Sequence, residues 1–254
     1  LRYWSMDTML IPKAGVISRW RKSHWNYLNR KQYAKKVLRP SCIMKDLRQT
    51  FWNIRYLFFP YTDRNYQSLF SAGAGMTCGD ITPSYFIIGD DKIKRLKRLN
   101  PNLKVILLLR NPVDRAWSKA KMNLCVNRNR RIEDVTENEL NCHLNFTFQS
   151  TPSYMNIINR WQQHFGSNLF IGYYDLLQEN PYEFYQQICH FLGIDANNIA
   201  DAVLRRMHEK VNKGIDANIP EYWREVLIEK YKPQVEEMDA SINPYKNSWL
   251  ESYE

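Results

Sequence analysis

The 254-residue sequence lacks several features that would assign it to a common protein class. No apolar run approaches the ~20 residues that a membrane-spanning helix needs. The GxxxxGK[ST] pattern of ordinary P-loop kinases and ATPases is absent, which argues against a protein of that kind. A chain of 254 residues is long enough for one good-sized core, so we expect one α/β domain. No internal repeat and no low-complexity tract interrupts it.

Cysteine is scarce, and none of the five cysteines belongs to a CxxC pair. They are Cys42, Cys78, Cys125, Cys142 and Cys189. This scattered, odd set argues against a zinc site and against a full disulfide framework. We therefore predict buried free thiols in a reducing compartment, and hence a cytoplasmic protein. A glycosylation sequon at Asn145–Thr147 keeps the Golgi lumen open as the alternative.

Positive charge is in excess: 36 Lys and Arg oppose 26 Asp and Glu, for a net charge of +10. This excess points to an anionic partner such as nucleic acid, an anionic glycan, an acidic lipid or a nucleotide. The segment Ser18–Val37 interleaves cations with Trp and Tyr, a pattern that suits base stacking. A helix that buries its aromatic side chains and solvates its charges is the alternative. No nucleic-acid fold signature accompanies it.

The stretch Lys104–Leu124, KVILLLRNPVDRAWSKAKMNL, has the pattern of a strand, a tight polar turn and a helix. The apolar run Val105–Leu109 predicts a strand that is covered on both faces. Asn111 is a good N-cap, and Pro112 suits the first helical position. Apolar residues then recur at helical spacing: they are Val113, Ala116, Trp117, Ala120 and Leu124.

Arg110 stands where this strand should end and the helix should begin. Free N–H groups and the helix dipole favour negative charge at such a point. Arg110 could add a bidentate fork to a phosphate, and Ser118 a hydroxyl from the helix. The alternative is a solvated Arg in one of the strand–turn–helix units that are common in α/β proteins.

The segment LLLRNPVDRAWS resembles the 3′-phosphate segment of PAPS-dependent sulfotransferases, whose sulfuryl donor is 3′-phosphoadenosine 5′-phosphosulfate (PAPS). Gly79–Tyr85, GDITPSY, resembles the GE-x-TPxY element of carbohydrate and bacterial members. Leu169–Leu192 resembles their next strand, acidic turn and helix ending in FLG. The resemblance covers Met76–Trp249 with its elements in family order, so it is far more specific than one motif.

The resemblance implies an α/β fold of three layers, with a central parallel sheet flanked by helices, as in P-loop NTPases. Strands separated by helices independently favour a parallel sheet with right-handed crossovers. We predict a single sulfotransferase domain over 1–254, with a basic, aromatic-rich subregion at 1–75 and a core at 76–254. The family's 5′-phosphosulfate loop and its catalytic Glu have no match here, so we expect them upstream of Leu1.

The implied reaction moves a sulfuryl group from PAPS to a hydroxyl or amine of a carbohydrate or small-molecule acceptor. The product of the donor is PAP, and no metal is expected. In the family, the strand-end Arg and the helix Ser hold the 3′-phosphate, which corresponds to Arg110 and Ser118 here. Arg115, from the same motif, is added to the predicted donor site.

A basic loop late in the sequence is the second predicted part of the donor site. Family members place a Gly-containing basic loop over the donor, and Asn212, Lys213 and Gly214 match it. Lys213 could contact the 3′-phosphate or the leaving phosphate. A solvated Lys in a turn is the alternative.

On the acceptor side, Asp80 is the carboxylate that we expect closest to the reaction. It is the candidate base that would take the acceptor proton, and a plain hydrogen-bonding role at a strand end is the alternative. Thr82 and Tyr85 belong to the same element and are predicted to bind substrate. His143 and Tyr154 are added to the substrate-binding set.

Two rival functions stay open. One is a basic, non-catalytic module that binds nucleic acid or another polyanion, as the aromatic-rich basic segment suggests. The other is a degenerate sulfotransferase that binds the nucleotide without turnover. The first interpretation expects a small-molecule or glycan acceptor and no specific nucleic-acid partner, and it leaves the oligomeric state open.

The remaining pattern predicts elements around this motif. We expect strands at Met76–Gly79 and Leu169–Tyr173, and an amphipathic helix at Tyr154–Phe165 closed by a glycine. Pro220–Met238 should be helical. The polar stretch Asn127–Phe148 is expected to be a long excursion, of the kind that often serves as a lid or substrate loop.

Overall fold

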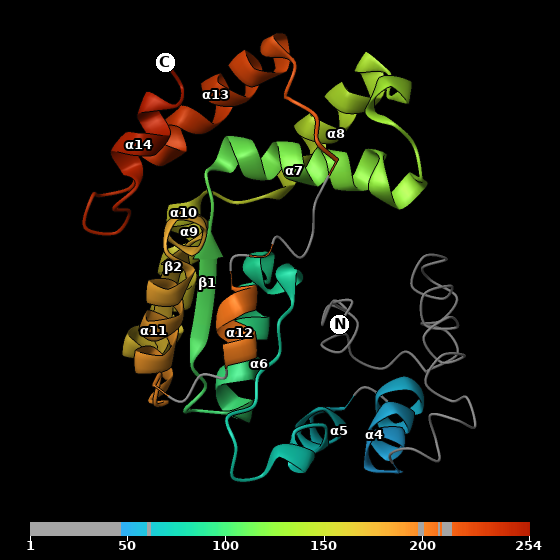
Figure 1. Ribbon diagram of the computed structural model, residues 1–254, viewed down its shortest axis with the longest axis vertical. Coiled ribbons are helices and arrows are strands. Elements are labelled where there is room, and N and C mark those ends of the chain that lie inside the picture. Colours follow the sequence, from blue (N-terminus) through green and yellow to red (C-terminus); the bar gives the residue numbers. More distant parts are fainter. Residues whose placement is uncertain (1–46, 60–61, 198–200, 208, 210–214) are drawn as a thin grey trace. The chain divides into compact units, whose positions relative to one another are not determined.

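The computed structural model describes residues 47–254 apart from 60–61, 198–200, 208 and 210–214. The basic aromatic segment Ser18–Val37 lies outside the described residues. The chain divides into two compact units, 1–101 and 102–254, and each is described by itself. The fold is helix-rich α/β with a parallel sheet, as predicted (Figure 1).

The described part of the first unit is helical. Its elements are α4 (Leu47–Phe58), α5 (Asp63–Ser68), the 3-10 turns η2 (Ser71–Gly73) and η3 (Pro83–Ile87), and α6 (Asp90–Leu99). The strand predicted at Met76–Gly79 is wrong, because these residues are irregular and exposed. A strand must satisfy its backbone groups by pairing, and no described strand pairs with this segment.

The second unit contains a two-stranded parallel sheet among the described residues. Strands β1 (Val105–Leu109) and β2 (Leu169–Tyr173) pair in parallel, with Leu109 opposite Tyr173 at their carboxyl ends. Both strands have the predicted bounds. Parallel neighbours need a long crossover, and three helices fill this one: α7 (Pro112–Leu124), α8 (Glu137–Ser150) and α9 (Tyr154–Phe165).

The prediction that β1 is covered on both faces is wrong. Leu107 and Leu109 are buried, whereas Ile106 and Leu108 are 39% and 44% exposed. The alternation follows from the two-residue period of a strand, which turns successive side chains to opposite faces. An all-apolar run therefore does not by itself show that both faces are covered.

Strand β2 continues into α10 (Tyr174–Glu179), and α11 (Pro181–Leu192) packs closely against the strand. Gly172 permits this approach, because a Cβ there would lie 2.7 Å from a ring carbon of Phe184. Gly193 ends α11 with a left-handed backbone, φ +74°, that glycine adopts without strain.

A hydrophobic core lies between α7, α8 and α13 (Glu221–Glu236), beside α14 (Lys246–Glu251). The predicted apolar stripe of α7 is buried there in full. Smaller elements complete the unit: η4 (Val126–Arg128), η5 (Ile132–Asp134), η6 (Gly166–Asn168) and α12 (Asp201–Arg206).

The stretch Asn127–Phe148 is not the irregular excursion that its polarity predicted. Most of it belongs to α8, whose start is a capping box between Thr136 and Glu139. Leu140 and Leu144 on α8 join the core with α7. The polar composition was misleading because one buried face is enough to fold a helix onto its neighbour.

Four cysteines fall within the described residues, and all four are thiols. Cys125 and Cys189 are buried as predicted, while Cys78 and Cys142 are exposed. Thr147, the third residue of the sequon, is fully buried in α8. Among the described residues, no helix is long and apolar enough to cross a membrane.

Candidate functional site

The carboxyl end of β1 delivers Arg110 to the start of α7, as the sequence predicts (Figure 1). Asn111 is the N-cap: its side-chain oxygen accepts a hydrogen bond of 3.0 Å from the Val113 N–H. Pro112 occupies the first helical position. The hydroxyl of Tyr154 donates a 2.6 Å bond to the carbonyl of Arg110, which fixes the backbone from which the arginine side chain leaves.

The guanidinium of Arg110 lies over the ring of Tyr174, 4.9 Å from its centroid, at the end of the neighbouring strand. Among the described residues it forms an ion pair with Asp114 alone, at 3.6 Å, and that carboxylate is 61% exposed. Such a long, solvated pair contributes little. The Nε of Arg110 is buried and has no hydrogen-bond partner among the described residues. The arginine thus stacks on Tyr174, and its Nε makes no hydrogen bond to the part of the chain that the structure describes.

The backbone at this helix start offers less to an anion than the sequence suggests. Pro112 has no N–H, Val113 donates to the Asn111 side chain, and Arg115 donates to the Asn111 carbonyl. An anion at this turn would therefore be held mainly by side chains, and Arg110 is the strongest donor there.

The other predicted donor-site residues lie along α7. Ser118 is exposed and follows Asn111 by seven residues, just under two helical turns, so it lies on the same side of the helix. Arg115 is half-buried, with its guanidinium 5.4 Å from the ring centroid of Tyr154. Tyr154, predicted to contact substrate, is itself 1% exposed. Its ring contacts the Arg115 guanidinium, and its hydroxyl holds the Arg110 carbonyl.

His143 lies on α8 and its Nε2 is 3.5 Å from the Thr147 hydroxyl. Its pKa is lowered by burial first, then by the positive charges of Lys119 and Arg128. The pKa of Lys119 is also lowered, by burial and by Arg115. Lys119 and Arg128 thus place positive charge near His143, and Arg115 does so near Lys119. No sequence pattern singled out Lys119 as a candidate site residue.

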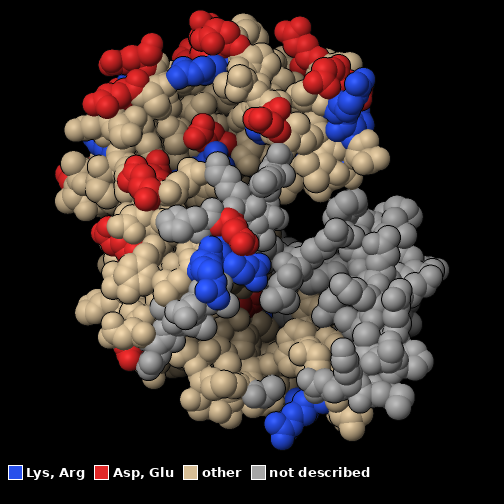
Figure 2. All heavy atoms as spheres, viewed as in Figure 1, with Lys and Arg blue, Asp and Glu red and all other residues tan. Residues whose placement is uncertain are grey.

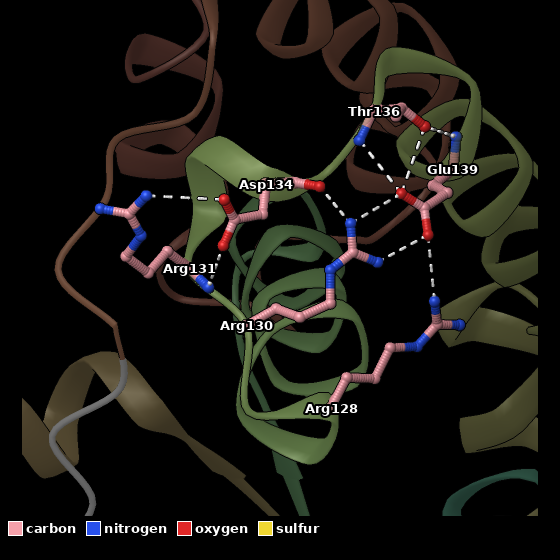
Figure 3. Close-up of polar contacts among 6 residues, drawn as sticks. All are labelled: Arg128, Arg130, Arg131, Asp134, Thr136 and Glu139. Atoms are coloured by element: carbon pink, nitrogen blue, oxygen red, sulfur yellow. Dashed lines mark hydrogen bonds and ion pairs between the residues drawn. The ribbon is translucent and has the colours of Figure 1, made fainter.

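Three arginines between α7 and α8 are already engaged with carboxylates (Figure 3). Glu139 accepts two bonds from Arg130, at 2.7 and 3.1 Å, and one from Arg128 at 3.2 Å. Arg131 pairs with Asp134 at 3.6 Å. The Arg130 bonds, then the Thr136 N–H, lower the pKa of Glu139 to about 2. Unlike Arg110, these arginines fasten the connection between two helices.

The predicted loop Asn212–Gly214 lies outside the described residues. The residues that follow it are anchored on α7. Lys121 donates to the carbonyls of Ile215 and Ala217, at 2.9 and 3.1 Å. The Trp117 indole N–H also donates to Ala217, at 3.0 Å. The chain therefore runs along the helix that carries Ser118.

In the first unit, Asp80 collects three hydroxyl groups. Tyr85 donates to one carboxylate oxygen at 2.5 Å, Tyr66 approaches the same oxygen at 3.4 Å, and Thr82 donates to the other at 3.0 Å. Burial is the main cause that raises the pKa of Tyr85 and that of Tyr66, so both remain protonated donors. Asp80 itself is exposed. The structure thus brings together three predicted residues, Asp80, Thr82 and Tyr85, and adds Tyr66.

Sequence reasoning missed Ser252 and Tyr253, which contact the Asn111 side chain. The Tyr253 hydroxyl donates to the side-chain oxygen of Asn111 at 2.9 Å. The side-chain nitrogen of Asn111 donates to the Ser252 hydroxyl at 3.3 Å. No sequence signal could have linked positions 141 residues apart.

Charge is unevenly distributed over the second unit. Acidic side chains gather along the top of the view in Figure 2, over α13. That helix exposes Glu221, Glu225, Glu229 and Glu236. An anionic ligand would be repelled there and favoured on the α7 side. No three His, Cys, Asp or Glu side chains form a metal-binding group in the part of the chain that the structure describes.

Comparison with known proteins gives a consistent result. The family model described as "Sulfotransferase domain" matches residues 93–241, more than half of the chain. Among solved structures, a sulfotransferase from Alicyclobacillus acidocaldarius is similar, with a TM-score of 0.58 and 21% sequence identity. The similarity covers 77% of this chain and 76% of that one. No curated protein sequence matches this chain.

Proposed function

Since the chain belongs to the sulfotransferase domain family, we propose that it transfers a sulfuryl group from PAPS to a hydroxyl or amine of a carbohydrate or other small acceptor. One observation carries the proposal beyond family membership. Arg110 stands at the carboxyl end of a parallel strand, stacked on Tyr174, with a buried Nε that has no partner among the described residues. Ligands of open α/β sheets bind at this edge.

The 3′-phosphate of the donor suits this position. A half-exposed guanidinium that is already oriented offers a bidentate fork at low entropic cost. Ser118 would add a hydroxyl hydrogen bond from the same side of α7. Arg115, half-buried on the same helix, would add positive charge near the phosphate. We assign the loop Asn212–Gly214 to the donor as well, at the 3′-phosphate or at the leaving phosphate. The 3′-phosphate does not react, so its role is to orient the sulfuryl group.

We propose Asp80 as the base that takes the acceptor proton. Both carboxylate oxygens already accept hydroxyl hydrogen bonds. The contact with Tyr66, at 3.4 Å, is the longest of the three. An acceptor hydroxyl would therefore replace Tyr66, while Tyr85 and Thr82 keep the carboxylate in position. Tyr85, Thr82 and His143 are the proposed substrate contacts.

The engaged state of Asp80 also favours a second candidate function, a sulfotransferase-like protein that binds the nucleotide without turnover. If no acceptor can displace a tyrosine, the carboxylate serves only to tie the loop 80–85 to α5. Both functions use the same phosphate site, and they differ in whether a sulfuryl group is transferred to an acceptor.

Two measurements separate these proposals. Calorimetry should give a clearly tighter Kd for PAP than for 5′-AMP, which lacks the 3′-phosphate. Equal affinities would remove the donor assignment. Transfer of labelled sulfate from PAPS to a panel of carbohydrate and phenolic acceptors then tests turnover. Tight PAP binding without transfer to any of them would favour the second candidate.

A polyanion-binding module makes the opposite prediction. Its affinity for DNA should fall steeply with salt and should not respond to PAP. We expect weak binding to DNA instead. A tight DNA complex that PAP does not displace would reverse this ranking.

A further inference from the structure

The segment from Trp249 to Tyr253 closes over the turn between β1 and α7. The Tyr253 hydroxyl donates a 2.9 Å bond to Oδ1 of Asn111, the oxygen that also caps Val113. The Asn111 Nδ2 donates to Oγ of Ser252 at 3.3 Å. Asn111 is also buried. Because both ends of its side-chain amide have protein partners, its rotamer is determined.

The segment is itself firmly attached. The Ser252 hydroxyl donates to the Trp249 carbonyl at 2.6 Å, and Arg224 of α13 donates to the Ser252 carbonyl. The Trp249 indole N–H donates to Asp175 at 2.9 Å, just beyond the end of β2. These bonds tie the segment to α13 and to the second strand.

A second route leads from Trp249 to the same arginine. The Trp249 ring is fully buried and packs edge-on against Tyr154, with centroids 6.4 Å apart. Tyr154 donates to the Arg110 carbonyl. The backbone of Arg110 is therefore held by Tyr154, and the next residue, Asn111, is held by Tyr253.

We propose that Tyr253 is a positioning residue for the Arg110 phosphate site. By fixing Asn111, its hydroxyl fixes the direction in which the Arg110 side chain leaves the strand. The inference rests on the proposed function, because it concerns how the same site binds the 3′-phosphate. A phosphate fork needs a geometry that the surrounding residues hold rigidly, and a single missing hydrogen bond in that support loosens the contact. Burial raises the pKa of Tyr253, so the hydroxyl remains a donor at ordinary pH.

The test uses the full chain with Tyr253→Phe, which removes the hydroxyl and keeps the ring. We expect the ratio of Kd for AMP to Kd for PAP to fall ~3- to 10-fold, the range of one hydrogen bond, with AMP affinity unchanged. Tyr245→Phe is the matched control, because it also removes a hydroxyl bond, to Glu179 at 3.1 Å. The control should leave the ratio intact.

A double-mutant cycle with Asn111→Ala isolates the route. If Tyr253 acts through Asn111, Tyr253→Phe should not lower the ratio further once Asn111 is removed. A merely structural role would lower thermal stability and weaken both nucleotides alike. The proposal is overturned if the wild type prefers PAP and Tyr253→Phe keeps that preference in full. A wild type without preference would instead remove the proposed function.

Discussion

The Arg110 turn and the Asp80 loop have similar local sequences and different tertiary environments. In each, a charged residue is followed within three positions by a proline that begins a helical turn, Pro112 in α7 and Pro83 in η3. Within the described residues, Arg110 forms a single long ion pair, to an exposed carboxylate. Asp80 has three hydroxyl contacts from 2.5 to 3.4 Å.

The difference shows that a charged residue before a helical turn can be either open to a ligand or already bonded within the protein, and that the local sequence does not distinguish the two cases. Arg110 extends over an aromatic ring, which gives it a fixed direction but few hydrogen bonds. Asp80 already accepts hydroxyl hydrogen bonds on both of its carboxylate oxygens. In the proposed reaction, a phosphate would meet an Arg110 that stacks on a ring, whereas an acceptor would meet an Asp80 that already accepts hydroxyl hydrogen bonds.

The sharpest way to break this comparison is to remove the negative charge of Asp80. For Asp80→Asn we expect kcat for sulfuryl transfer to fall by ~10²- to 10⁴-fold, the usual contribution of a general base. PAP affinity should stay at the wild-type value. Steady-state kinetics with calorimetry checks both, and a kcat within twofold of wild type would leave Asp80 a purely structural role.

The next largest effect should come from Arg110→Ala. Loss of a bidentate, charge-assisted contact costs about 1.5–3 kcal/mol, so PAP should bind ~10- to 100-fold more weakly while AMP is little affected. The exposed Arg98 of α6 provides a matched control as Arg98→Ala. If both substitutions weaken PAP equally, the effect is general electrostatics and not a site.

A smaller effect of opposite sign is expected for Asp114→Asn. This carboxylate is the one charged partner of Arg110 within the described residues, and it would compete with and repel a bound phosphate. Removing its charge should tighten PAP binding by ~2- to 5-fold, in line with the small value of an exposed ion pair. Weaker binding would mean that Asp114 orients the arginine.

The smallest effect concerns acid stability and tests the engaged arginines of Figure 3. The pKa of Glu139 is lowered to about 2, chiefly by Arg130. A lowered carboxyl pKa stabilises the fold above the ordinary value of 4.5, and this contribution is lost as the pH falls toward 2. Urea unfolding of Glu139→Gln should differ from wild type at pH 6 and converge with it near pH 2. A constant difference across that range would contradict the assignment.

Local sequence determined much of the second unit. The N-cap Asn111, the proline after it and the apolar stripe of α7 are encoded within a dozen residues, and the structure has them as predicted. The strand Leu169–Tyr173 and the helix Tyr154–Phe165 were predictable for the same reason. Periodicity and capping act between neighbours in the chain, so a sequence shows them directly.

Tertiary structure decided what these elements contact. Whether Met76–Gly79 forms a strand depends on a pairing partner, and whether Asn127–Phe148 folds onto α7 depends on one buried helix face. The Tyr174 ring next to Arg110 and the bond from Tyr253 to Asn111 come from distant segments, the latter 142 positions away. The hydroxyls on Asp80 come from no further than 14 positions away, and two of them belong to its own sequence element. The sequence by itself determined which chemical groups the chain carries at its candidate site. The tertiary structure decided which of them are free to bind, because hydrogen-bond partners and burial are set by packing between distant segments.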